Sequence, residues 1–150
     1  MKNLFFCSIL MTVSVMLNAQ TAEDSVKTTI NRFFEGMKKG DTALIKSTMT
    51  EGVIFQTIAR KKEGGLSVKT EDVASFIKFI GEPKKDVPDE RITFETIKID
   101  GVLASVWTPY KFYSGDKFIH CGANSFQLVK TDDAWKIQYI IDTRRKQGCE

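Results

Sequence analysis

The sequence is poor in the residues that build metal and redox sites: its 150 residues include one histidine, three cysteines and three prolines. One histidine, His120, without converging acidic residues leaves too few ligands for zinc, so we expect no metal and no cofactor. The formal net charge of +3 is too small to indicate a nucleic-acid partner or binding to an anionic membrane. There are no repeats and no low-complexity segments, and the length suits a single globular domain.

Residues 1–19 have the pattern of a secretory signal peptide. A short basic start is followed by an uncharged apolar run from Leu4 to Leu17, and the small residue Ala19 ends the segment. This run has ~14 residues, whereas a membrane span needs roughly 20. We therefore predict cleavage after Ala19, a secreted or periplasmic protein with no membrane segment after cleavage, and one domain over residues 20–150.

The first half of the predicted domain has mainly helical periodicity. One helix is expected from a cap at Thr21 to a stop at Gly40, and a second begins after Asp41. A strand is expected at about 53–59, followed by a polar loop. A third helix is predicted from about Thr70 to Gly81.

From Arg91 onward the hydrophobic period changes to two, which is typical of strands. Four runs follow, at residues 91–99, 102–113, 116–130 and 135–145. Asp100-Gly101 and Ser114-Gly115 are predicted as two-residue hairpin loops, and Thr131 to Ala134 as a longer one. Helices followed by an antiparallel meander indicate the α+β class.

Several stretches resemble the nuclear transport factor 2-like family, in particular its SnoaL-like branch and the branch provisionally named lumazine-binding. The stretches are Gly40-Asp41 with Leu44, "ASVWTPYKFY" at 104–113, "HCGANSFQLVK" at 120–130 and "WKIQYIIDTRR" at 135–145. The resemblance implies a cystatin-like cone, in which a curled antiparallel sheet packs on the N-terminal helices and leaves a pocket at the open end. Members of this family include ketosteroid isomerases, dehydratases, polyketide cyclases and many non-enzymatic binding or dimerising domains.

The predicted loops give a strand register, because side chains alternate between the two faces of a sheet. In this register the concave face combines aromatic and small polar side chains, as expected for a binding pocket. The predicted ligand-binding residues, including two from the first helix and the first strand, are Phe34, Phe55, Thr96, Ser105, Trp107, His120, Asn124 and Tyr139. Trp107 would lie opposite Gly122 and could stack on a planar ligand.

The opposite, convex face is predicted to be too apolar for a surface in water. Its residues would be Ala104, Val106, Thr108, Tyr110 and Phe112 beside Ile119, Cys121, Ala123, Ser125 and Gln127, ending in Gln138, Ile140, Asp142 and Arg144. Proteins of the family that the sequence resembles often pair through this face. We therefore expect a homodimer through the convex sheet.

His120 and Cys121 are adjacent on one strand and must point to opposite faces, which argues against a cysteine–histidine catalytic pair. His120 alone is a candidate general acid or base, although its place at the rim favours a structural or ligand-orienting hydrogen bond. The predicted register puts Asp142 outside. Long strands of this kind bend at bulges, and a single bulge would turn Asp142 inward, near His120.

Three functions remain open from the sequence. The first is a binding domain for a hydrophobic or planar small molecule. The second is a cofactor-free isomerase, dehydratase or cyclase that uses His120 and Asp142. The third is a dimeric interaction domain whose pocket is filled by its own side chains. Whether Cys121 and Cys149 form a disulfide is open as well.

Overall fold

The computed structural model describes residues 21–61, 63–132 and 134–149. The predicted signal peptide lies outside these residues, so cleavage and export stay predictions. Within the described ranges, no helix combines the length and the apolar character that a membrane crossing requires.

Three helices form in the N-terminal half: α1 (Ala22–Lys39), α2 (Thr42–Ser47) and α3 (Val73–Gly81). The predicted caps are confirmed, since Thr21 Oγ1 accepts a hydrogen bond from the backbone of Asp24 at 3.1 Å. Gly40 ends α1 in the left-handed conformation, with φ at 68°. Asp41 accepts a hydrogen bond from Leu44 and starts α2 immediately afterwards.

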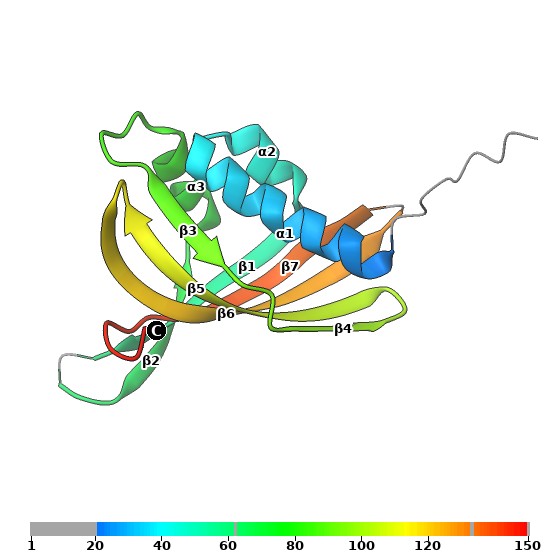
Figure 1. The fold of residues 1–150 in the computed structure, drawn as a ribbon. Coiled ribbons are helices and arrows are strands. Elements are labelled where there is room, and N and C mark those ends of the chain that lie inside the picture. The colour runs from blue at the N-terminus through cyan, green and yellow to red at the C-terminus, as the bar shows by residue number, and fades with distance from the viewer. Residues whose placement is uncertain (1–20, 62, 133, 150) are drawn as a thin grey trace, which may run out of the picture.

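The helices lie in the hollow of one curled sheet (Figure 1). Its strands are β1 (Met49–Arg60), β2 (Leu66–Glu71), β3 (Pro88–Ile92), β4 (Thr96–Asp100), β5 (Leu103–Ser114), β6 (Lys117–Thr131) and β7 (Ala134–Thr143). The order is β2-β1-β7-β6-β5-β3, and β4 pairs with β5 beyond the end of β3. The predicted α+β cone is confirmed, but the sheet is mixed, because β1 and β7 run parallel.

Two details of the strand prediction were wrong. The sequence indicated no strand at β2, which extends β1 as an exposed hairpin and has little apolar patterning. Residues 91–99 were predicted as one strand, but they belong to two strands, β3 and β4. Both strands pair with β5, and a short connection separates them. There, the backbone N–H groups of Thr93 and Glu95 donate to the carbonyl oxygens of Pro109 and Trp107.

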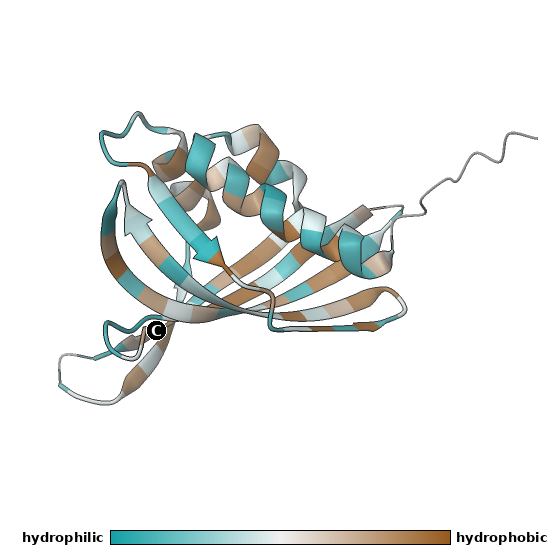
Figure 2. Ribbon diagram, viewed as in Figure 1, coloured by the Kyte–Doolittle hydropathy of each residue, from teal (hydrophilic) through white to brown (hydrophobic). Residues whose placement is uncertain are grey.

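The core fills the space between α1 and the concave sheet. Hydrophobic residues alternate with hydrophilic ones along the long strands, as Figure 2 shows. Val26, Ile30 and Phe33 of α1 are buried against the sheet. From the sheet, Phe126, Leu128 and Ile137 are fully buried. Each such side chain stabilises the fold by about 1.5–3 kcal/mol.

The loop between β5 and β6 differs from the prediction. Ser114 pairs with Lys117, so the loop is Gly115-Asp116 and the pairing moves by two residues. A bulge at Ile119 then shifts the register by one more residue. This bulge reverses the inward face of β5 relative to β6.

The β5 residues that were predicted to be convex therefore face the helices. Val106, Thr108 and Tyr110 are almost completely buried, and the prediction that they form a dimer surface was wrong. The inward face of β6 was predicted correctly, with His120 and Asn124 lining the hollow of the sheet.

The loop between β6 and β7 follows the prediction, with Lys130 opposite Trp135. The register holds as far as Leu128, which pairs with Ile137. The next pair is Gln127 with Tyr139, so Gln138 is an extra residue in β7. This bulge reverses the faces of the sheet to which the later side chains of β7 point.

Gly122 allows two segments to approach closely. A Cβ atom at this position would lie 1.8 Å from the carbonyl oxygen of Thr143 and 2.7 Å from the ring of Tyr110. The space above Gly122 was assigned to Trp107 in the predicted register. Tyr110 occupies it instead, because Tyr110 is the residue that pairs with Gly122.

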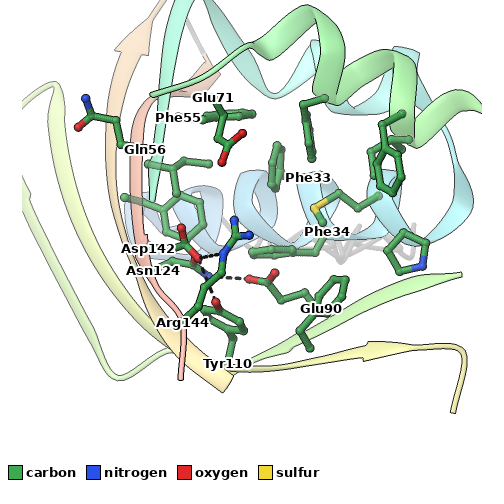
Figure 3. A pocket seen from close by; sticks show the side chains of 18 of the residues that line it. Phe33, Phe34, Phe55, Gln56, Glu71, Glu90, Tyr110, Asn124, Asp142 and Arg144 are labelled. Atoms are coloured by element: carbon green, nitrogen blue, oxygen red, sulfur yellow. Dashed lines mark hydrogen bonds and ion pairs between the residues drawn. The ribbon is translucent and has the colours of Figure 1, made fainter. Parts of the chain in front are cut away.

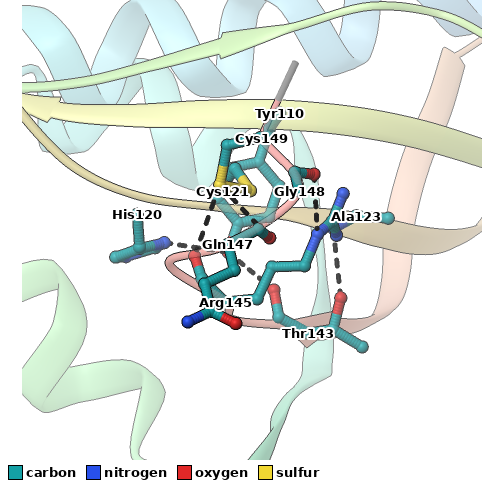
Figure 4. Close-up of a disulfide and its surroundings, with 9 residues drawn as sticks. All are labelled: Tyr110, His120, Cys121, Ala123, Thr143, Arg145, Gln147, Gly148 and Cys149. Atoms are coloured by element: carbon teal, nitrogen blue, oxygen red, sulfur yellow. Dashed lines mark hydrogen bonds between the residues drawn. A yellow bond between two sulfur atoms is a disulfide. The ribbon is translucent and has the colours of Figure 1, made fainter.

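A disulfide joins Cys121 to Cys149, with the two Cα atoms 5.7 Å apart (Figure 4). The tail after β7 turns back so that Arg145 pairs through its backbone with Cys121. The two cysteines are 28 residues apart in sequence. Closing a loop of that size stabilises the folded state by roughly 3–4 kcal/mol in the chain-entropy model.

The convex face carries several exposed apolar side chains. Trp107 and Leu103 of β5 are 43% and 47% exposed, and Val102 precedes them in the loop. This set differs from the predicted one. The homodimer itself stays a prediction.

Replacing Gly122 with alanine tests the close approach. We expect Gly122→Ala to lower the free energy of unfolding by about 1–3 kcal/mol, because the backbone of Thr143 and the ring of Tyr110 must move. Urea denaturation followed by circular dichroism measures the change. Gly81→Ala is the matched control, since a Cβ there meets only the Thr42 methyl group, at 3.0 Å. Equal stability of the two variants would contradict the predicted constraint.

Candidate functional site

A cavity of about 510 Å³ opens between the helices and the concave sheet. Its volume lies in the range of small-molecule sites, about 300–1,000 Å³. It is lined by Phe33, Phe34, Met37, Phe55, Gln56, Glu71, Asp72, Ser75, Phe76, Phe79, Ile80, Pro88, Glu90, Tyr110, Phe112, His120, Asn124, Phe126, Ile140, Asp142 and Arg144. Figure 3 shows part of this lining, with aromatic rings on one side and polar groups on the other.

The apolar wall is a cluster of phenylalanines from α1, α3 and the sheet. Phe33 lies edge-on to Phe34 and Phe55, with ring centres 5.3 and 5.8 Å apart. Phe34 in turn meets Phe126 at 6.0 Å, and Phe55 meets Phe76 at 5.4 Å. These edge-to-face contacts fix the orientation of the rings, so the wall is rigid as well as apolar.

Asp142 lies at the centre of the polar end. Its Oδ2 accepts from Arg144 Nε at 2.9 Å and lies 3.0 Å from the hydroxyl of Tyr110. The same hydroxyl is 2.9 Å from the carbonyl oxygen of Thr143, and its single proton can serve only one of these acceptors at a time. Burial, together with the charges of Asp142 and Glu90, raises the pKa of Tyr110, which therefore stays protonated.

Glu90 projects from β3 into the same space. Its Oε1 accepts from Asn124 Nδ2 at 2.8 Å, and Asn124 itself is 4% exposed. Burial raises the pKa of Glu90 to about 7, and the charge of Asp142 contributes in the same direction. The hydrogen bond from Asn124 and the charge of Arg144 act against this rise. Glu90 is thus a carboxyl group that changes charge near neutral pH.

His120 stacks on Phe112, with ring centres 5.0 Å apart, and its Nδ1 lies 3.5 Å from the hydroxyl of Tyr110. Burial lowers the pKa of His120, and the charge of Arg144 lowers it further, against the opposing effect of Asp142. His120 is consequently neutral at pH 7. His120 and Asp142 both line the cavity, and the hydroxyl of Tyr110 lies between them, 3.5 Å from the one and 3.0 Å from the other.

The bulge at Gln138 brings Asp142 into the cavity, because it reverses every β7 side chain that follows it. The straight register, which put Asp142 outside, was wrong, and the bulged alternative is the one observed. The same bulge turns Tyr139 outward, where its hydroxyl donates to Gln56 at 2.6 Å.

Four predicted ligand-binding residues do not line the cavity. Thr96, Ser105 and Trp107 lie on the convex side because the bulge at Ile119 reverses their face relative to β6, and Tyr139 is displaced by the bulge in β7. Phe34, Phe55, His120 and Asn124 do line it, and their role in binding a ligand stays a prediction.

Three prominent groups of the polar end were not among the predicted site residues: Glu90, Tyr110 and Arg144. Tyr110 and Arg144 were assigned to the convex face by the straight register. Glu90 lies in the charged segment Lys84–Arg91, where nothing local separates it from solvated carboxylates. The strand pairing gives the position of Glu90. A strand that begins at Pro88 pairs with β5 and directs the Glu90 side chain into the hollow of the sheet.

The described residues contain no group of three or more histidine, cysteine, aspartate or glutamate side chains placed to hold a metal ion. The chemistry that this polar end offers is hydrogen bonding and proton transfer through Glu90, Asp142 and Tyr110.

The raised pKa of Glu90 predicts a pH-dependent stability. In the unfolded chain the carboxyl ionises near pH 4.5, whereas the folded state keeps the proton up to about pH 7. The folded state therefore binds more protons between these values, and stability falls as pH rises through this window. Glu90→Gln removes this effect. As the pH rises from 4.5 to 8, the free energy of unfolding of the variant should increase by about 2 kcal/mol relative to that of wild type.

Urea denaturation at pH 4.5 and pH 8 measures this difference. Glu95→Gln, at an exposed carboxylate outside the cavity, is the control and should follow the wild-type curve. If Glu90→Gln shows the same pH dependence as wild type, the proposed titration of Glu90 is wrong.

Comparison with known proteins gives structural relatives only. No family model and no curated protein matches the sequence. A nuclear transport factor 2-like protein of unknown function from Shewanella baltica OS155 is similar, with a TM-score of 0.64 and 16% identity over 83% of this chain and 94% of that chain. A conserved protein from Planctomyces limnophilus DSM 3776 has a TM-score of 0.63 and 20% identity, covering 82% and 95% of the two chains.

A candidate dehydratase of the same fold family from Streptomyces avermitilis is similar to the same degree. Its TM-score is 0.62 and its identity 16%, over 82% of this chain and 95% of that chain. At such identities the likeness concerns the fold. The helices in the hollow of a curled sheet, the strand order and these relatives agree, and the chain has the nuclear transport factor 2-like fold.

Proposed function

We propose that the protein binds a small, mainly hydrophobic molecule that carries one polar end. The observation that carries this proposal is the cavity of about 510 Å³, with a phenylalanine wall facing Glu90, Asn124 and Asp142. An apolar site with a few convergent polar groups is the usual form of a small-molecule site.

The hydrophobic wall supplies most of the binding free energy. Moving a ligand's apolar surface from water into the cavity yields about 25 cal/mol per Å² of buried area. The wall is preorganised by its ring contacts, so little ordering of side chains is needed when a ligand enters. An interaction domain with a filled pocket is less well supported, because the side chains of the described residues leave the cavity open.

The proposal predicts that blocking the cavity mouth abolishes binding. Ser75 lies on α3 at the mouth and is exposed, and Ser75→Trp would place an indole in the opening. With the neutral fluorescent dye N-phenyl-1-naphthylamine as probe, we expect an affinity at least about tenfold weaker than wild type, because the indole occupies the volume that the dye needs.

Ala74→Trp is the matched control, since Ala74 is exposed on the same helix and does not line the cavity. It should leave the affinity for the dye unchanged. Equal affinities of the two variants, or no binding of the dye to wild type, would contradict the proposal.

We propose proton-transfer catalysis as a second candidate function, and the inward position of Asp142 favours it. Asp142 is an acceptor inside the cavity, held by Arg144 and Tyr110, with neutral His120 nearby. Isomerisation, dehydration and cyclisation of carbonyl compounds can each begin with the removal of a proton next to the carbonyl group by a general base. The dehydratase description of the Streptomyces avermitilis relative is consistent with this candidate.

The catalytic candidate predicts exchange of carbon-bound hydrogen. With 4-phenylbutan-2-one in deuterated buffer, we expect the protein to speed deuterium incorporation next to the carbonyl at least about tenfold, as general base catalysis does. NMR follows the exchange. Asp142→Asn should abolish the acceleration, and Asp100→Asn, at an exposed site on β4, should retain it. An Asp142→Asn variant as active as wild type would rule out this role.

A further inference from the structure

The ionisable groups around the cavity are mostly acidic. Four of the residues that line it are carboxylates, and one is an arginine: Glu71, Asp72, Glu90, Asp142 and Arg144. The only histidine, His120, is neutral at pH 7 because burial lowers its pKa. The lining therefore carries a net negative charge, which grows by one when Glu90 ionises.

Arg144 does not neutralise this excess. It forms an ion pair with Asp142 at 2.9 Å, and its single positive charge also acts on Glu90 and Glu71, so the carboxylates stay in excess. Asp72 accepts a hydrogen bond from the backbone of Ser75 at the start of α3, a position that favours a negative charge. Glu90 and Glu71 remain as carboxylates without a cationic partner among the described ion pairs. Figure 3 shows Glu71 and Glu90 on either side of the Arg144 side chain.

Three acceptor atoms at the polar end have no partner among the described residues, and the Nη groups of Arg144 are free donors beside them. Asn124 is 4% exposed, and its Nδ2 donates to Glu90, while its Oδ1 has no partner among the described residues. Within the same part of the chain, Glu90 Oε2 and Asp142 Oδ1 are also left without a hydrogen bond. These three acceptors can receive hydrogen bonds from a ligand, and the excess of carboxylates in the lining favours a cationic donor.

The aromatic wall adds to the attraction for a cation. The faces of phenylalanine rings carry partial negative charge, and a cation within about 6 Å of a ring centre is stabilised by it. Phe34 and Glu90 both line the cavity (Figure 3). A positive group in the cavity would therefore be attracted by carboxylates and by aromatic rings together.

We infer that the polar end of the cavity takes the protonated amino group of a ligand whose body is hydrophobic. The inference rests on the proposed small-molecule binding and assigns the chemical class of the ligand. An ammonium group provides up to three N–H donors, which match the three free acceptor atoms of Glu90, Asn124 and Asp142.

Because Glu90 titrates, the inference predicts that the affinity for an ammonium group depends on pH. The titratable groups on the elements packed around Glu90 are Tyr110 from β5, His120 from β6, Asp142 and Arg144 from β7 and its tail, and Glu71 and Asp72 from the β2–α3 connection. The cavity-lining residues of α1 and α3 carry no titratable group. Glu90 has a pKa of about 7, so its negative charge is present at pH 8 and mostly absent at pH 6.

Three probes of equal shape and different charge test the inference: 4-phenylbutylammonium, 4-phenylbutanol and 4-phenylbutyrate. Isothermal titration calorimetry at pH 8 should give an affinity for the ammonium at least about tenfold higher than for the alcohol, with the butyrate weakest. Affinity for the ammonium should fall about tenfold between pH 8 and pH 6, because Glu90 takes up a proton over that range.

Glu90→Gln removes the charge and keeps the acceptor for Asn124. In this variant the ratio of ammonium to alcohol affinity should fall about tenfold, and its dependence on pH should disappear. Glu95→Gln, outside the cavity, should keep the wild-type ratio.

The outcomes separate the inference from the proposed function. If N-phenyl-1-naphthylamine binds but the ammonium is not preferred over the alcohol and the butyrate, the inference is overturned and the proposed function stands. A preference for the butyrate would instead assign the recognition to Arg144. If neither the dye nor any of the three probes binds, both are wrong.

Discussion

The polar end of the cavity depends on the missing side chain at Gly122. Because no Cβ stands there, the ring of Tyr110 lies against β6 and its hydroxyl reaches the carbonyl oxygen of Thr143 at 2.9 Å. That contact ties β5 to the end of β7 across β6, and the same hydroxyl lies 3.0 Å from Asp142, which Arg144 also contacts. A side chain at position 122 would push the Tyr110 ring away from both acceptors.

Local signals in the sequence predicted the ends of the first two helices and the first pairs between β6 and β7. Thr21, Gly40 and Asp41 act through residues within one helical turn, and the loop from Thr131 to Ala134 sets the β6–β7 register for its first pairs. The inward face of β6 followed from alternation alone. These features are local, and a single sequence contains the information for them.

The candidate site was less predictable because it depends on two bulges. At the bulge, Thr50 Oγ1 donates a hydrogen bond of 2.9 Å to the side-chain oxygen of Gln138. The two residues are 88 positions apart in the sequence. No residue near Gln138 in the sequence indicates such a contact. One misplaced residue reverses a whole strand face, which is why Trp107 and Tyr139 were placed inward while Tyr110 and Arg144 were placed outward.

A carboxyl group beside a phenylalanine wall is costly for stability, since Glu90 gives up part of its hydration. Folds tolerate such conflicts mainly at sites where they serve binding or chemistry. The position of Glu90 does not serve the stability of the sheet, and it agrees with the proposed binding of a ligand in the cavity.

The disulfide between Cys121 and Cys149 has a further consequence for the last two strands. It fastens the tail beyond β7 to β6, while the tight loop at Thr131 to Ala134 joins the other ends of the same strands. A bulge can be lost from a strand pair only if one strand slides by a residue at one end. Here both ends are anchored, so the covalent link keeps the extra residue within β7 and favours the register that turns Asp142 to the inner side of the sheet.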